Sequence, residues 1–150
     1  MWDELRRFST LPGQAQRLFL RAMVALPLIR ESLRRRGFQA TQASLQKRIG
    51  APGAPTTDTQ RIATTVRMVQ AAARHGLGPA SCLEESLTLW WLLARQGVAS
   101  ELRIGVRKDA GGIKAHAWVE REGAALNEPQ ARHAHYEAFE TEFPLSVGEP

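Results

Sequence analysis

The 150-residue sequence has very little cysteine and no long apolar run. The one cysteine, Cys82, excludes a disulfide within the chain and any zinc site built from several cysteines. The longest apolar run, 22–29, is eight residues long and contains Pro27, whereas a helix that spans a bilayer needs roughly 20 residues. Asp3 and Glu4 stand near the start and no small-residue cleavage site follows, so we expect no secretory signal. The sequence therefore predicts a cytoplasmic protein that does not bind a membrane.

Charge is distributed unevenly along the chain. The net charge is +7 over residues 1–50, +2 over residues 51–80 and −4 over residues 81–150, which gives the overall +5. A basic front half suits nucleic acid, an acidic peptide or a negatively charged partner surface, although many such arginines only solvate helix faces. The hydrophobic content of 43% is enough for a real core at this length, which excludes a disordered chain.

Residues 1–50 are predicted to form a helical N-terminal subdomain. Ser9 can cap a helix that has Pro12 in its first turn, and apolar residues then recur at helical spacing up to Gly37. Pro27 has no amide hydrogen and its ring clashes with the carbonyl one turn earlier, so we expect a kink just before it.

A shorter helix is expected over residues 41–49. The Gly- and Pro-rich stretch 50–57 that follows is the one linker-like segment of the sequence. Beyond it, Thr57 or Asp58 can cap a helix whose apolar face continues to Gly76.

The next predicted helix begins at Cys82 and ends at Gly97. Leucine and tryptophan occur on nearly all its sides, which indicates a buried central helix.

After this helix the apolar period changes from helical to two. Apolar and polar residues alternate over 102–107 and again over 115–120, and the Gly-rich stretch 109–112 between them can turn the chain. The pattern predicts an antiparallel hairpin, followed by a short third strand over 124–127.

Cys82 and His116 form a candidate pair of nucleophile and base. The unpaired amides at a helix N-terminus stabilise a thiolate over a thiol, whose free pKa is about 8.5, and an imidazole nearby lowers it further. The same amides can bind the oxyanion that forms during acyl transfer. The alternative is that the cysteine is only a small buried hydrophobic residue.

The residues around this pair resemble a known family. The segments ASCLEESL (80–87), LRIGVRK (102–108) and AHAWVE (115–120) are similar, in this order, to the stand-alone leader peptidase of lasso-peptide biosynthesis, a transglutaminase-like cysteine protease. The resemblance is strongest over residues 60–130. It implies an α+β fold, in which a helical front part precedes a transglutaminase-like or papain-like core over 57–150, with the central Cys helix packed on a small antiparallel sheet.

The resemblance also implies a catalytic triad. Cys82 and His116 match the family's nucleophile and histidine, and the acid, twelve residues after the histidine, falls on Glu128, where the family commonly has aspartate. Asn127 is the alternative third residue. Trp118 and Trp90 are candidates for lining the substrate cleft.

The implied function is removal of the leader peptide from a lasso-peptide precursor. By resemblance, a separate leader-binding protein delivers the precursor, and an asparagine-synthetase-like cyclase uses ATP to close the ring. The chain itself is expected to bind neither metal nor cofactor, and the basic cluster Arg34–Arg36 is expected to contact the partner or the leader. Two alternatives stay open: a non-catalytic basic module that binds nucleic acid, and an acyltransferase on the same fold.

Overall fold

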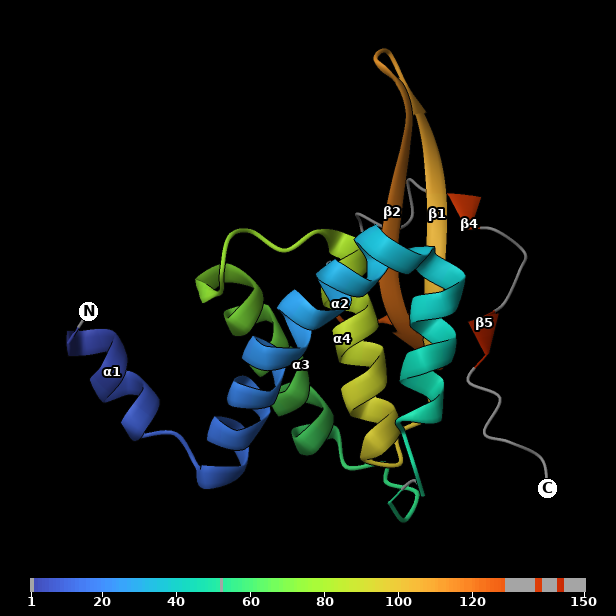
Figure 1. The fold of residues 1–150 in the computed structure, drawn as a ribbon. Helices are drawn as coiled ribbons and strands as arrows, with labels where there is room; N and C mark the ends of the chain where they lie inside the picture. Colours follow the sequence, from blue (N-terminus) through green and yellow to red (C-terminus); the bar gives the residue numbers. More distant parts are fainter. Residues whose placement is uncertain (1, 52, 129–136, 139–142, 145–150) are drawn as a thin grey trace.

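The computed structural model describes residues 2–51, 53–128, 137–138 and 143–144, and it confirms the α+β fold class (Figure 1). The helices and strands follow one another as α1 (Trp2–Ser9), α2 (Gly13–Lys47), α3 (Thr59–His75), α4 (Cys82–Arg95), β1 (Glu101–Asp109), β2 (Gly112–Arg121), β3 (Ala124–Ala125), β4 (Glu137–Ala138) and β5 (Phe143–Pro144). Within these described residues, no helix combines the length and apolar character needed to cross a bilayer.

The helices within residues 1–50 differ from the prediction in where they begin and end. Residues 2–9, for which no helix was predicted, form α1, and Pro12 stands at the N-cap of α2. The separate helix expected over residues 41–49 is joined to α2, whose one break in helical torsion lies at Gly37, with φ 80° and ψ 179°. Glycine tolerates this positive φ because it has no Cβ. The torsions through Pro27 stay helical, and the one marked break, at Gly37, lies ten residues after this proline instead of just before it.

The helices α3 and α4 begin at side-chain caps, of which the sequence analysis predicted the one at Asp58 but not the one at Ser81. The Asp58 carboxylate accepts hydrogen bonds from the amides of Gln60 and Arg61. Ser81 and Glu84 form a reciprocal capping box at the start of α4. These contacts satisfy amides that a helix N-terminus leaves without partners, and they fix the residue at which each helix starts.

One hydrophobic core joins α2, α3, α4 and the hairpin. Its members with at most 1% exposure come from all of these elements and from the link between α4 and β1: Ala22, Val69, Ala72, Leu87, Leu89, Trp90, Leu92, Leu93, Val98, Leu102 and Val119. Figure 1 shows α4 between the other helices and the hairpin. The prediction of a buried central helix beginning at Cys82 is therefore confirmed.

The sheet is built around the predicted antiparallel hairpin. The strand order is β3-β2-β1-β4, and β5 also pairs with β1. β1 and β2 pair continuously from Glu101↔Glu120 to Asp109↔Gly112. The third strand is shorter than the predicted 124–127 and covers only Ala124–Ala125. Figure 1 shows that the turn end of the hairpin projects beyond the helices.

The linker-like stretch packs against the end of α4. The Thr56 amide donates to the Gly97 carbonyl at 3.2 Å. Gly97 has φ +77°, and a Cβ there would lie 2.6 Å from the carbonyl oxygens of Gly53 and Ala54. Only glycine fits both the torsion and the space.

Candidate active site

Cys82 is the first residue of α4, and its side chain is half-buried. The Ser81 hydroxyl accepts from the Glu84 amide at 3.2 Å, and Glu84 Oε2 accepts from the Ser81 amide at 3.1 Å. The capping box therefore fixes the main chain on both sides of the thiol. At this position the helix presents amides and partial positive charge, which can stabilise an oxyanion.

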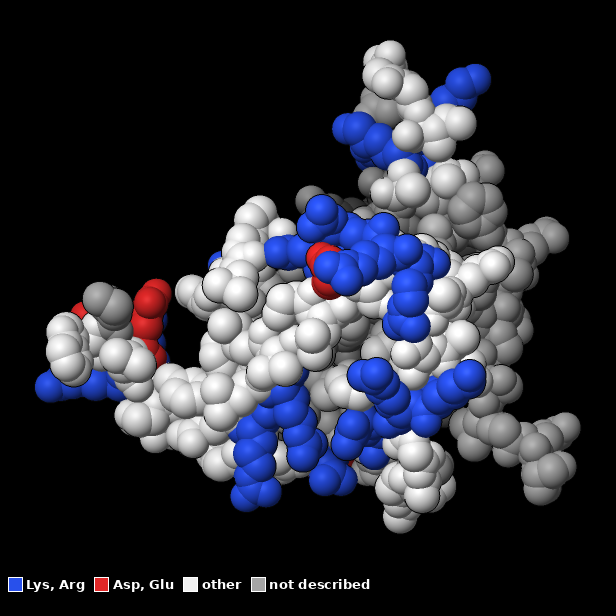
Figure 2. Space-filling model, in the orientation of Figure 1, with Lys and Arg blue, Asp and Glu red and all other residues white. Residues whose placement is uncertain are grey.

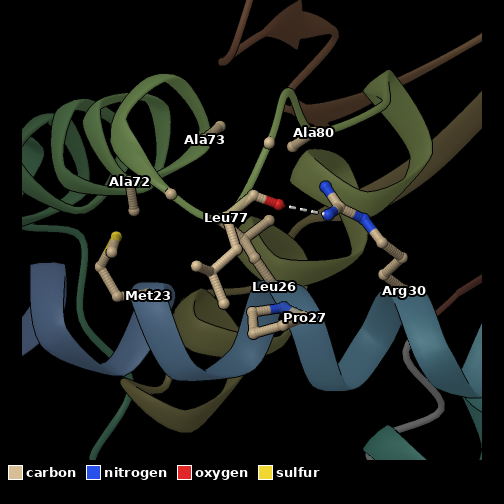
Figure 3. Close-up of a pocket in the computed structure, with 10 residues that line it drawn as sticks. Met23, Leu26, Pro27, Arg30, Ala72, Ala73, Leu77 and Ala80 are labelled. Atoms are coloured by element: carbon tan, nitrogen blue, oxygen red, sulfur yellow. Dashed lines mark hydrogen bonds between the residues drawn. The ribbon is translucent and has the colours of Figure 1, made fainter.

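An arginine from α2 holds the turn that leads into Cys82. Arg30 donates from Nη1 to the Leu77 carbonyl at 2.7 Å and from Nη2 to the Pro79 carbonyl at 3.0 Å. Its Nε and Nη2 atoms also both donate to Glu84 Oε2 at 3.1 Å. Figure 3 shows the Arg30 side chain reaching from α2 toward Leu77 and Ala80. The start of α4 is thus fixed from outside the helix as well as by its own cap.

His116 lies on β2, and its Nε2 atom contacts Glu128 Oε2. The exposed fraction of the side chain is 17% for His116 and 5% for Glu128, so the pair is largely shielded from water. The Trp118 ring stacks near the imidazole, with ring centroids 6.0 Å apart and planes inclined by 24°. Because Glu128 holds Nε2, Nδ1 is the ring nitrogen that can exchange a proton with a nucleophile.

A hydrogen bond ties the Cys82 helix to the His116 strand. Ser86 lies one turn after Cys82, and its buried hydroxyl donates to the Ala117 carbonyl at 3.1 Å. Residues four apart share one face of a helix, so Cys82 lies on the face of α4 that meets β2. Ala117 directly follows His116 in the sequence. The fold therefore brings the nucleophile candidate and the histidine candidate to the same contact between two elements.

Asn127 joins the elements around the site instead of contacting His116. Its Nδ2 donates to Ser86 Oγ at 3.1 Å and to Glu85 Oε1 at 3.4 Å, and its Oδ1 accepts from the Val119 amide at 2.9 Å. Its carbonyl accepts from the Gln70 side chain at 3.1 Å. Of the two predicted candidates for the third residue, the structure places Glu128 on the imidazole and Asn127 among α3, α4 and β2.

Glu85 is an acidic neighbour of the site that the sequence analysis did not single out. Burial raises the pKa of the Glu85 carboxyl above its ordinary value of 4.5, and the negative charge of Glu128 acts in the same direction. The hydrogen bond from Asn127 and the positive charges of Arg74 and His116 oppose this rise. A glutamate within an apolar helix was a usable sequence signal, because a charged residue there needs partners. Arg30 gave no comparable signal, since its partners are distant in the sequence.

The two tryptophans expected to line a substrate cleft are buried. Trp90 is 0% exposed and Trp118 is 1% exposed. Trp90 belongs to the central core, where its large ring fills space between elements. The Trp118 indole donates to Glu120 Oε1 at 2.8 Å. Both rings are covered by other residues, and their role in lining a substrate cleft stays a prediction.

The arrangement contains the parts of a nucleophilic acyl-transfer site. A thiol stands at a capped helix start, an imidazole stands on the strand packed against that helix, and a shielded carboxylate holds the imidazole. An acid in this position fixes the tautomer of the imidazole and stabilises the imidazolium.

A comparison with protein families agrees with this fold. The family model described as Transglutaminase-like superfamily matches residues 22–141, which include Cys82, His116 and Glu128. This superfamily commonly contains cysteine peptidases and acyltransferases. No curated protein and no solved structure matches the chain. Since the matched residues extend from α2 to beyond the sheet's third strand and make up most of the chain, the protein belongs to the transglutaminase-like superfamily.

Proposed function

We propose that this protein is a cysteine peptidase that removes the leader from a lasso-peptide precursor. The observation that carries the peptidase assignment is the His116–Glu128 pair on the strand that packs against the start of the Cys82 helix. The lasso precursor as substrate rests on the three sequence segments 80–87, 102–108 and 115–120, which resemble the lasso leader peptidase in order and spacing.

In the proposed reaction, the Cys82 thiol gives its proton to Nδ1 of His116. The thiolate attacks the carbonyl carbon of the last leader residue, and the amides at the start of α4 bind the resulting oxyanion. His116 then returns the proton to the departing amine, so the core peptide leaves and a thioester to the leader remains. Water attacks the thioester, His116 takes up and returns a proton, and the leader carboxylate is released. Glu128 holds the imidazole throughout.

The basic surface of α2 is a proposed docking site for the leader-binding protein or the leader. Arg34 and Arg35 carry side chains that are 75% and 77% exposed, and both pair with Glu31. Figure 2 shows lysine and arginine gathered in several groups over the face that α2 presents. Such a face attracts an acidic partner. The ATP-using cyclase of the proposed pathway acts after release of the core and needs no site on this chain.

Mass spectrometry of a lasso precursor incubated with this protein and a leader-binding partner tests the proposal. We expect a core peptide and a leader that ends in a free carboxylate. Cys82→Ala and His116→Ala should abolish cleavage while the variants stay folded, and His75→Ala, at the end of α3, should cleave normally as a matched control. Normal cleavage by folded Cys82→Ala would contradict the peptidase assignment. A leader joined to an added amine, with no free acid, would favour the acyltransferase alternative.

A further inference from the structure

The edge of β2 that faces away from β1 is covered over only part of its length. β3 pairs with Glu120 and Arg121 at one end of β2. In the part of the chain that the structure describes, no strand pairs with this edge between Gly112 and Val119. Ile113 is 76% exposed, and Ala115 is also exposed. Among the described residues, an uncovered sheet edge therefore leads up to His116.

The register of the hairpin determines which main-chain groups this edge presents. β1 and β2 pair without a bulge from Asp109↔Gly112, next to the turn, to Glu101↔Glu120. In an antiparallel pair, alternate residues direct both their N–H and C=O groups to the partner strand, and the residues between them direct these groups to the other side. Because Asp109 and Gly112 close the turn, the even-numbered residues of β2 bond to β1 and the odd-numbered residues face outward.

Three contacts agree with this assignment. The Val119 amide donates to Asn127 Oδ1 at 2.9 Å, and the Val119 carbonyl accepts from the Leu126 amide at 2.8 Å. The Ala117 carbonyl accepts from the Ser86 hydroxyl at 3.1 Å. The exposed outward groups that remain are the N–H and C=O of Ala115 and Ile113, for which the described residues offer no partner, and the N–H of the buried Ala117 marks the inner end of this edge.

We propose that this open edge, Ile113 to Ala117, binds the peptide substrate as an added β-strand. The proposal rests on the peptidase function proposed above and specifies how the substrate backbone is held. An added strand lies about 4.8 Å from β2, so a peptide paired with Ala115 runs beside the residue that precedes His116. Main-chain pairing of this kind supplies affinity for any extended segment, while side-chain pockets supply the sequence preference.

The position and composition of the edge favour the substrate over a second copy of the chain. The edge ends at the Ser86–Ala117 hydrogen bond, the same contact that places the Cys82 helix on β2. Proteins commonly protect free edges with proline, bulges or several charges. Between Ile113 and Ala117 there is no proline or bulge, and Lys114 is the one lysine or arginine. The exposed alanine at 115 also leaves room for the side chains of a neighbouring strand.

A scan of the precursor with single N-methyl groups tests the proposal with the unmodified enzyme. In an added strand only every second amide of the peptide faces β2, so N-methylation should raise KM at alternate positions near the cleavage bond. We expect a rise of about tenfold at each sensitive position, the effect of losing one hydrogen bond of about 1.4 kcal/mol. Equal effects at neighbouring positions, or no effect on KM at any position, would overturn the added strand.

A pair of variants tests the same edge from the enzyme side. Ala115→Pro removes an outward N–H but no bond to β1, so the hairpin should persist while KM rises. Ala115→Ser keeps that N–H and should leave KM unchanged. The rate at which iodoacetamide alkylates Cys82 reports an intact site, and it should be the same in wild type and both variants. If Ala115→Pro fails to fold, the N-methyl scan still decides.

The outcomes separate this proposal from the proposed function. A wild-type protein that leaves the precursor intact with its leader-binding partner present would contradict the peptidase function itself. Cleavage with no alternation in the scan and an unchanged KM for folded Ala115→Pro would contradict only the edge proposal. Sedimentation that shows wild-type dimers, and monomers for Ala115→Pro, would assign the edge to a second copy and would also overturn it.

Discussion

The carboxylate of Glu84 and the guanidinium of Arg30 connect the first turn of α4 to α2 across 54 positions of sequence. One oxygen, Glu84 Oε2, accepts from the Arg30 Nε and Nη2 atoms and from the Ser81 amide, each at 3.1 Å. The group that caps the helix is therefore the group that the arginine holds. The start of the Cys82 helix and the position of α2 cannot change independently.

Arg30→Ala should lower both stability and turnover. It removes the donor of the exposed Leu77 and Pro79 carbonyls, which water can replace, and the ion pair of the 13% exposed Glu84 carboxylate, and a hydrogen bond to a charged group contributes about 1.5–3 kcal/mol. Denaturant unfolding measures the stability, and kcat on the precursor reports the position of Cys82. Arg34→Ala is the matched control, because its side chain is 75% exposed and its loss should change stability by at most about 0.5 kcal/mol. Equal unfolding curves for the two variants would contradict the role of Arg30.

Glu128→Gln should mainly lower kcat, whereas Asn127→Ala should mainly lower the melting temperature. Glu128→Gln keeps the shape beside His116 but removes the charge that stabilises the imidazolium, so kcat should fall while the melting temperature stays close to that of wild type. Asn127→Ala removes the contacts to Ser86, Glu85 and the Val119 amide, so its main effect should be a lower melting temperature. If Asn127→Ala instead reduces kcat more than Glu128→Gln at unchanged stability, the carboxylate is not the third catalytic residue.

Glu85 should make stability depend on acidic pH. Burial raises the pKa of the folded carboxyl above the ordinary 4.5, so between the unfolded and folded pKa values the folded state binds more protons than the unfolded state. Stability therefore falls as pH rises through this interval, and the loss is complete above the folded pKa. Glu85→Gln cannot ionise and should be free of this loss.

The measurement is the melting temperature of wild type and Glu85→Gln at a series of pH values from 4 upward. The difference, variant minus wild type, should grow as pH rises. Both proteins contain the groups that act on the Glu85 carboxyl, which are Arg74, His116, Asn127 and Glu128. Only the difference between the two melting temperatures therefore reports on Glu85. A difference that stays constant with pH would show that Glu85 titrates as in the unfolded chain.

The parts of the fold with a clear apolar period could be predicted from sequence. α4 and the hairpin follow patterns of helical spacing and of strict alternation, and a deep core enforces such patterns. α1 was missed because it buries none of its residues, so it needs no apolar face. Two helices were predicted where α2 continues across Gly37, because a glycine followed by a new apolar run is also typical of two separate helices.

The site could be predicted only where one residue carries the signal. Cys82 at a helix start and His116 on the next hairpin stand in recognisable local patterns, whereas Glu128 was indicated only by the family resemblance. The structure places His116 and Glu128 in contact. The residues that hold these side chains in place show no such local pattern. Arg30 and Gln70 contact residues 47 to 57 positions away, and no local rule links such pairs.

Charge reversal of Arg34, Arg35 and Arg36 to glutamate tests the proposed docking site. We expect KM for the precursor to rise in the presence of the leader-binding partner, with a smaller change in kcat. Activity at low precursor concentration should also fall as salt rises, because exposed charges are screened beyond about 8 Å at physiological ionic strength. The control is cleavage without the partner.

The same preparation can test the nucleic-acid alternative. Docking to a protein or peptide predicts only weak binding to an unrelated oligonucleotide. Tight oligonucleotide binding that weakens steeply with salt, together with cleavage that is indifferent to the three reversals, would contradict docking and favour the basic nucleic-acid module.

The contact between Arg30 and Glu84, together with the one between His116 and Glu128, has a consequence for the order in which the chain becomes active during synthesis. The first contact needs a residue near the front of the chain, and the second needs a residue that the ribosome adds almost a hundred positions later. A nascent chain that has already exposed its cysteine still lacks the histidine strand and the acid. Under the proposed function, the chain would therefore act as a peptidase only after Glu128 has left the exit tunnel, when its own folding is nearly complete.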